Sequence, residues 1–310
     1  MTTLLITHKA FLEHDTGYGH PEQPNRMRAV NDALAAPAFN PLKREEAPQA
    51  DLAAIERLHP RSYIDMVRAA IPARDHKRLD PDTVVSPGSW EAALRAVGGA
   101  LRAVDAVVAG EADNAFCAVR PPGHHAEPAR AMGFCLFNTV AVAALHARAK
   151  HGAERVAVVD FDVHHGNGTQ AAFWKDKDLF YASTHQMPLF PGTGELGETG
   201  VGNIFNAPLK AGDDGEDIRD AFASRILPSL HDFGPDLIIV SAGFDAHLMD
   251  PLAQLRLVEA DFAWVTEKLM EQAEKHCGGK LVSSLEGGYD LDALGRSVAT
   301  HVETLMGAAS

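Results

Sequence analysis

The segment Arg155-Val-Ala-Val-Val-Asp-Phe-Asp-Val-His-His-Gly-Asn-Gly168 joins an apolar run to a dense group of polar residues. Its first part, Val156–Val159, has no alternation of polar and apolar residues, which is typical of a strand covered on both faces in a parallel sheet. The polar residues follow at the carboxyl end of this strand, where open parallel sheets bind their ligands. The segment therefore predicts a parallel α/β fold with a functional site at one edge of the sheet.

The same alternation of apolar runs and helical stretches extends over the whole chain. The expected strands are Thr3–Thr7, Ala115–Val119, Arg155–Asp160, Leu179–Ser183, Leu237–Ser241 and Lys280–Leu285. Helical periodicity is found in Trp90–Ala109, Asn138–His151, Asp217–Phe233, Val258–His276 and Leu291–Leu305. This order predicts a doubly wound parallel β-sheet with helices on both faces, in a single domain over residues 1–310. Lys43–Arg61 and Ile71–Ser89 lack both patterns and are expected to be irregular surface loops.

Composition limits the class of protein. Apolar residues make up 46% of the 310 residues, which is enough for a buried core. No apolar run reaches the roughly 18 residues that a membrane helix needs. Met1–Ala10 lacks a basic start and a small-residue cleavage site, so we expect a first strand and a cytoplasmic protein. Cys117, Cys135 and Cys277 form no CxxC pair, which argues against a thiolate metal site and is compatible with a reducing compartment.

The formal net charge of −14 bears on partners. Nucleic-acid binding needs basic patches, so a phosphate-backbone partner is not expected. Attraction of cationic substrates, such as lysine side chains or polyamines, is compatible with this charge. On charge alone, a generic acidic surface without a functional role is the favoured explanation.

Unusual polar motifs follow five of the expected strands. They are Arg120-Pro-Pro-Gly-His-His125, Asp160-Phe-Asp-Val-His-His-Gly-Asn-Gly168, His185 with Phe190-Pro-Gly-Thr-Gly194, Gly243-Phe-Asp-Ala-His247 and Glu286-Gly-Gly-Tyr289. In a parallel sheet these loops converge on one edge. Their coincidence is the main indication of a site.

Asp160, Asp162 and His164 alternate along the chain and would share one face if the segment is extended. Two carboxylates beside an imidazole repel and lose hydration unless a cation compensates. Asp162 and His164, joined by Asp245 after another strand, would supply one nitrogen and two carboxylate ligands to a divalent metal. Three protein ligands with one open position are typical of catalytic zinc. The alternative is helix capping and loop hydrogen bonding without a metal.

His124 and His125 are adjacent and follow a rigid Pro-Pro-Gly sequence. Beside a metal, such a pair is suited to proton transfer because imidazole titrates near neutral pH. Asp160 is expected to orient and charge-stabilise His124. The hydroxyl of Tyr289 could donate to a developing oxyanion.

Two aromatic residues lie in glycine-flanked loops near these motifs. Phe134 follows Gly133, and Phe190 precedes a Pro-Gly-Thr-Gly sequence. As a facing pair they would line a narrow channel for a methylene chain, whereas core packing is the alternative. His185 and His247 are ambiguous and are not assigned to the metal.

Together these motifs resemble the histone deacetylase superfamily. The matching segments are His20-Pro-Glu22 with Arg26, Arg120-Pro-Pro-Gly-His-His125, Gly133-Phe134, Asp160-Phe-Asp-Val-His-His-Gly-Asn-Gly-Thr169, Phe190-Pro-Gly-Thr-Gly194, Gly243-Phe-Asp-Ala-His247, Asp250-Pro251 and Leu285-Glu-Gly-Gly-Tyr289. The resemblance implies an arginase-like fold and zinc-dependent hydrolysis of acyl amides. It also implies that Asp162, His164 and Asp245 hold zinc, that His124 and His125 are the tandem histidines, and that Tyr289 is the oxyanion tyrosine.

Two positions refine the resemblance. Asn167 stands where one branch of the family has an aspartate behind the second histidine, so the chain looks like the class II branch, which includes acetylpolyamine amidohydrolases. Without a carboxylate there, His125 should be less basic. Leu252 falls where a polyamine-selective relative carries a glutamate gatekeeper, which favours acyl-lysine over acylpolyamine as the substrate.

The resemblance further implies potassium near the active site, on the backbone of Asp160, Asp162 and His164 together with Ser183. Two other readings stay open, namely an arginase-like enzyme with two metal ions and a binding protein for amines without catalysis. The early loop Glu13–Arg26 is expected to shape the rim of the site or a homo-oligomer contact.

Overall fold

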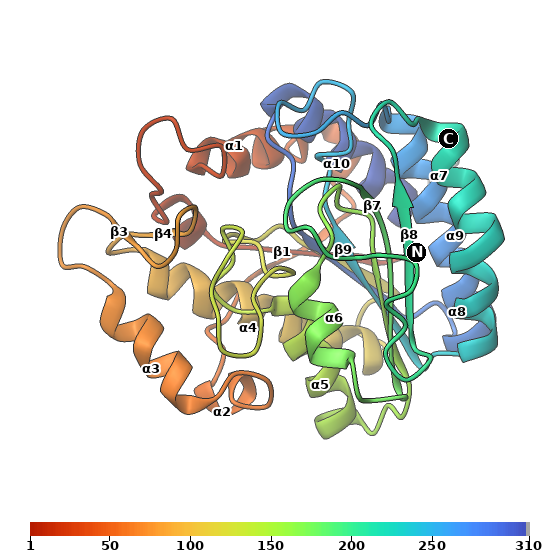
Figure 1. Cartoon of the computed structure of the whole chain (residues 1–310), viewed down its shortest axis with the longest axis horizontal. Coiled ribbons are helices and arrows are strands. Elements are labelled where there is room, and N and C mark those ends of the chain that lie inside the picture. Colours follow the sequence, from red (N-terminus) through yellow and green to blue (C-terminus); the bar gives the residue numbers. More distant parts are fainter. Residues whose placement is uncertain (308–310) are drawn as a thin grey trace.

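The computed structural model describes residues 1–307, so the final residues of the predicted domain lie outside the described part (Figure 1). Its centre is a sheet of eight strands in the order β2-β1-β5-β10-β9-β6-β7-β8. The strands are β1 (Thr3–Thr7), β2 (Lys43–Glu46), β5 (Asn114–Cys117), β6 (Val156–Asp160), β7 (Leu179–Gln186), β8 (Ile204–Leu209), β9 (Leu237–Ala242) and β10 (Leu281–Leu285). All neighbouring pairs run parallel. A separate antiparallel pair joins β3 (Lys77–Arg78) to β4 (Val84–Val85).

Helices cover both faces of this sheet, as Figure 1 shows. The helices are α1 (Pro24–Ala33), α2 (Leu52–Ile55), α3 (Arg61–Ala70), α4 (Ser89–Val108), α5 (Thr139–His151), α6 (Asn167–Phe173), α7 (Gly215–Ala221), α8 (Leu227–Phe233), α9 (Glu259–Cys277) and α10 (Leu291–Leu305). On one face α4 and α5 pack on the central strands, and on the other α9 and α10 do so with α1 outside them. Among the helices of residues 1–307, none is long and apolar enough to cross a membrane.

The predicted doubly wound parallel sheet is confirmed. All six predicted strands are present, with ends that differ by at most three residues. The central strands β6 and β9 are buried at every residue, as their unbroken apolar runs predicted. Buried residues of the strands and of the facing helices form one continuous core.

The two edge strands were not predicted. β2 reads Lys-Arg-Glu-Glu and alternates between half-buried and exposed residues, so it carries no apolar signal. Its region was expected to be an irregular loop, and that expectation is wrong. Backbone pairing with β1 orders the strand although its sequence has no hydrophobic pattern. β8 contains Pro208, which a strand tolerates at the edge of a sheet.

The helix predicted over Asp217–Phe233 is interrupted. A single π-helical turn, η3 (Phe222–Ile226), separates α7 from α8. Such bulges shift the buried face by one residue. α3 was missed although Tyr63, Ile64 and Val67 are buried at helical spacing.

Candidate active site

The polar loops after β5, β6, β7, β9 and β10 meet at the carboxyl edge of the sheet. The register explains the convergence, because Asp160 at the end of β6 lies beside Ser183 of β7 and Ser241 of β9. Residues that are distant in sequence therefore come together because their strands end at one level.

Asp162, His164 and Asp245 form a buried group with ligand atoms within 4.8 Å of one another. His164 Nδ1 lies 3.0 Å from Asp245 Oδ2 and 3.2 Å from Asp162 Oδ1. Tetrahedral coordination at metal–ligand distances of about 2.1 Å separates neighbouring ligand atoms by roughly 3.4 Å. The donor set and its spacing thus fit one divalent metal ion.

Backbone amides hold these carboxylates in place. Val163 N–H donates to Asp245 Oδ1 at 2.9 Å, and Gly287 N–H donates to Asp162 Oδ2 at 2.8 Å. Gly243 and Gly287 pass so close that a side-chain carbon would collide with the carboxylate of Asp162 at Gly243 and with that of Asp245 at Gly287. The two glycines therefore have a steric role at the site.

The electrostatics of the group support a bound cation. Burial raises the pKa of Asp245 to about 6, and the neighbouring Asp162 adds to this shift. Burial alone would lower the pKa of His164, but the two carboxylates raise it to about 10. Two buried carboxylates that share one imidazole are poorly compensated, and a divalent ion would supply the missing charge.

His124 is held by the carboxylate predicted to orient it. Its Nδ1 lies 2.9 Å from Asp160 Oδ2, which also accepts a hydrogen bond from Tyr181 at 3.0 Å. Burial alone would lower the pKa of His124, but Asp160 and Asp162 raise it well above its usual value. His124 is therefore suited to carry a positive charge.

His125 differs from its neighbour. Its Nδ1 lies 2.9 Å from Asn167 Oδ1, and burial, together with the positive charges of His124 and His164, lowers its pKa well below the usual range. The predicted low basicity is reproduced, but burial is its largest cause and the absence of a carboxylate is not. The Nε2 atom of His125 has no hydrogen-bond partner among residues 1–307 and is available to a substrate or water.

Tyr289 and the predicted channel residues border this centre. The ring of Phe134 meets that of Tyr289 edge to face at 5.8 Å, and the ring of Phe190 meets that of His125 at 5.1 Å. Gly133 packs so tightly on His125 that a side chain there would collide with the imidazole. Burial raises the pKa of Tyr289 well above its usual value, so its hydroxyl keeps its proton as a donor.

A buried ion network lies behind the site and includes Glu22 and Arg26, to which the sequence assigned no role. Glu22 accepts hydrogen bonds from Arg26 Nη1 at 3.1 Å and from Arg120 Nη2 at 2.8 Å. Arg26 donates in turn to the carbonyl of Gly288 at 2.6 Å and lies 5.0 Å from the ring of Tyr289. The network therefore positions the loop that carries Tyr289, a role that only the fold reveals.

Other functional residues were also missed. Glu286 is buried and accepts from the backbone N–H groups of Gly123 and His124, which fixes the histidine pair from behind. Asp250 accepts from Tyr289 N–H at 2.7 Å. Both lie inside motifs of the family resemblance, Asp250-Pro251 and Leu285-Glu-Gly-Gly-Tyr289, and that membership was the available signal.

His185 and His247, which the sequence left ambiguous, lie outside the group formed by Asp162, His164 and Asp245, called the metal group below for its proposed role. His185 Nε2 donates to the Gly194 carbonyl at 2.9 Å, and its Nδ1 accepts from Ser183 Oγ at 2.9 Å, so the ring links β7 to the following loop. His247 contacts Glu259 at 3.5 Å. Leu252 is half-buried, with its backbone N–H on Asp250, and its contact with a substrate remains a prediction.

A second group with metal-binding residue types lies between α4 and α5. Asp105 Oδ1 is 2.7 Å from His146 Nε2 and 2.6 Å from His151 Nε2. These are hydrogen-bond distances. Arg57 Nη1 lies 3.3 Å from His146 Nδ1, and its positive charge disfavours a metal ion at this group. This group therefore links two helices.

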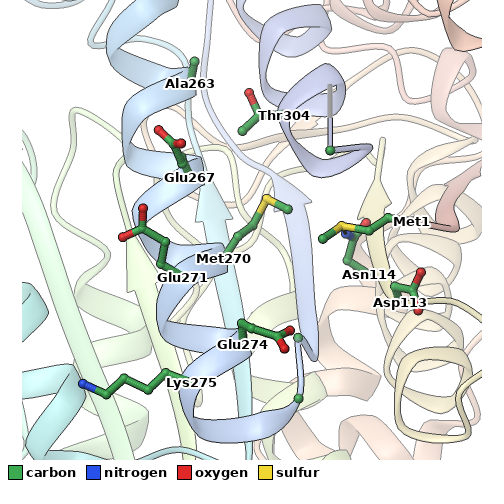
Figure 2. Close-up of a pocket in the computed structure, with 13 residues that line it drawn as sticks. Met1, Asp113, Asn114, Ala263, Glu267, Met270, Glu271, Glu274, Lys275 and Thr304 are labelled. Carbon is green, nitrogen blue, oxygen red and sulfur yellow. Dashed lines mark hydrogen bonds between the residues drawn. The ribbon is translucent and has the colours of Figure 1, made fainter. Parts of the chain in front are cut away.

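A cavity of about 830 Å³ lies at the opposite edge of the sheet (Figure 2). Met1, Asp113 and Gly279, which line it, precede the first residues of β1, β5 and β10. Ligands of open parallel sheets bind at the other ends of the strands. We therefore assign the site to the carboxyl edge.

Comparisons with known proteins agree with this geometry. Residues 20–305 match the histone deacetylase domain. The chain is 43% identical over 277 residues to a histone deacetylase-like amidohydrolase of Pseudomonas aeruginosa, covering 87% of this chain and 73% of that protein. It is 37% identical to a probable deacetylase of Archaeoglobus fulgidus, with 94% and 82% coverage. The solved structure of the HDA15 HD domain superposes with a TM-score of 0.94 at 35% identity, covering 99% of this chain and 89% of that one.

Proposed function

The chain belongs to the histone deacetylase family, and we propose that it is a zinc-dependent hydrolase of acyl amides on lysine side chains or related amines. One observation carries the proposal. Asp162, His164 and Asp245 converge on one metal position, with His125 on one side and the loop of Tyr289 adjoining.

Zinc fits this donor set, because one imidazole and two carboxylates leave a coordination position open. When bound there, zinc would polarise the amide carbonyl and lower the pKa of a coordinated water. Potassium at the backbone of Asp160, Asp162 and His164 with Ser183 is part of the proposal as a structural ion.

The side chains would divide the reaction between them. His125 Nε2 takes a proton from the attacking water, since its Nδ1 faces Asn167. Tyr289 donates its hydroxyl proton in a hydrogen bond to the oxyanion of the tetrahedral intermediate. As the C–N bond breaks, a protonated imidazole of the pair donates to the leaving amine. The products are a carboxylate and a free amine.

The substrate preference follows from the rim. Phe134 and Phe190 would flank a methylene chain that leads to the carbonyl. Leu252 offers no carboxylate for a second ammonium, which favours acyl-lysine, and an acylpolyamine is the alternative. The proposed partner is a small molecule or peptide, without nucleic acid or membrane, in cytoplasmic surroundings.

A fluorogenic acetyl-lysine peptide, assayed with and without a chelator and after zinc is restored, tests the reaction. We expect activity that depends on zinc, at one catalytic ion per chain. Tyr289→Phe should lower kcat about 10²- to 10³-fold while zinc stays bound. Glu303→Ala, at an exposed glutamate of α10, is the control. Wild-type turnover by Tyr289→Phe would remove the tyrosine from the mechanism, and two tightly bound ions at the site would favour an arginase-like enzyme.

A further inference from the structure

A chain of side-chain hydrogen bonds leads from the site to the surface behind His125. His125 Nδ1 faces Asn167 Oδ1 at 2.9 Å. At its other end, Asn167 Nδ2 donates to Glu127 Oε1 at 2.9 Å and lies 3.3 Å from Met132 Sδ. The carboxylate of Glu127 thus lies behind His125, and the side chain of Asn167 separates the two.

The two ends of an amide differ, because its oxygen accepts and its nitrogen donates. Glu127 and Met132 offer only acceptor atoms, so the nitrogen of Asn167 must face them. The oxygen then faces His125, whose Nδ1 must carry a proton and whose Nε2 must keep its lone pair. A hydrogen bond to a charged carboxylate is roughly twice as strong as a neutral one, so Glu127 dominates this choice.

Glu127 itself is held in position. Its backbone N–H donates to the carbonyl of Arg130 at 3.0 Å, which closes a tight turn. His59 Nε2 accepts from Asn138 N–H, so its Nδ1 is the protonated atom and donates to the Pro128 carbonyl at 3.0 Å. Burial lowers the pKa of His59 to about 4, which keeps it neutral and this pattern intact.

The carboxylate of Glu127 lies close to solvent. A surface cleft of about 500 Å³ is lined by Glu127, Asn167 and Thr193 among others. Glu127 is partly exposed beside this cleft, so a substitution there leaves no closed cavity in the core.

We propose that Glu127 is a positioning residue, which fixes the orientation of the Asn167 amide and thereby the tautomer of His125 that can accept a proton. The inference rests on the proposed function, in which His125 is the base. Glu127 touches neither the metal group nor the reacting atoms, so it acts only through Asn167.

Kinetics on the zinc-loaded full chain test this role. Glu127→Ala should lower kcat about tenfold or more with little change in KM, because the wrong tautomer becomes populated. Glu127→Gln keeps an acceptor oxygen and should retain most of the activity. Glu127→Lys presents donors, favours the flipped amide and should be the most impaired. Glu303→Ala, at an exposed glutamate, is the control.

The Asn167→Asp background provides a second test. An aspartate presents an acceptor to His125 in either orientation, so Glu127→Ala should cost no activity there and should relieve repulsion between two carboxylates. An equal loss in both backgrounds would show a general structural effect and overturn the proposal, as would Glu127→Ala within twofold of wild type.

Two-bond 1H–15N spectra of histidine-labelled protein separate this inference from the proposed function. The His125 signal, identified by its loss in His125→Ala, should report the Nδ1–H tautomer in wild type and a mixture in Glu127→Ala. An unchanged tautomer would overturn the positioning role whether or not the enzyme is active. If wild type hydrolyses no acyl amide while the tautomer shifts as expected, the proposed function fails and the positioning role stands.

Discussion

Gly287→Ala would add one methyl group where the loop after β10 meets two of the proposed metal ligands. A side-chain carbon at this position would collide with Asp245 Oδ2 and would stand 2.6 Å from Asp162 Oδ2. Gly287 lies outside the left-handed region, so backbone strain is not the cause of the expected defect. The effect comes from the contact alone.

The magnitude follows from these distances. Side-chain carbons essentially never approach another atom closer than 3.0 Å, so Asp162 Oδ2 must withdraw by about 0.4 Å and Asp245 Oδ2 by more. Metal–ligand distances tolerate changes of only about 0.2 Å. Disturbing the support of a ligand typically weakens metal affinity about 10- to 100-fold, or about 1.4–2.7 kcal/mol. We expect a loss in this range, with kcat reduced in the zinc-loaded variant.

The assay is competition for zinc with a chelator of known affinity, followed by metal analysis and turnover of an acetyl-lysine peptide. Gly197→Ala is the control, because nothing lies within 4 Å of the added carbon. Circular dichroism would establish that both variants fold. Wild-type zinc affinity and turnover in a folded Gly287→Ala protein would refute the geometry proposed for the metal group.

Two predictions concern stability. Burial lowers the pKa of His301 to about 3. Below about pH 6.5 the unfolded chain therefore binds a proton on this histidine that the folded protein does not bind. The free energy of unfolding therefore falls by about 2 kcal/mol between pH 7 and pH 5. In urea unfolding of the metal-free protein, His301→Gln should show a shallower pH dependence than wild type. Equal slopes in the two proteins would contradict this. Glu22→Gln leaves Arg26 and Arg120 without their buried counter-charge, and should lower the free energy of unfolding by about 3–5 kcal/mol in the same assay. A loss below 1 kcal/mol would mean that solvent or neighbouring carbonyls compensate the two guanidinium groups.

The sequence was informative wherever a physical requirement acts locally. Val156–Val159 must be buried on both faces, and this requirement is visible as an unbroken apolar run. β2 carries no such run because an edge strand is ordered by its hydrogen bonds to β1. The grouping of Asp162 with His164 was also visible, because their spacing of two is local.

Contacts between distant segments were beyond this local signal. Glu127 lies 40 residues before Asn167 in the sequence, and nothing in this spacing indicates that the two side chains meet. The same holds for Arg26, whose contacts with the Gly288 carbonyl and the Tyr289 ring span more than 260 residues. Such pairs depend on how loops close after the strands are in register.

The residue types by themselves determined the fold class and the family resemblance and indicated the proposed metal chemistry, because strand burial and the donor types of side chains are properties of short segments. Tertiary structure alone decided which carboxylate faces which imidazole, where backbone amides meet the ligands, and which glycines leave no space for a side chain. The physical reason is that distances of about 3 Å between residues far apart in the chain are set by the register of the sheet and the packing of its loops.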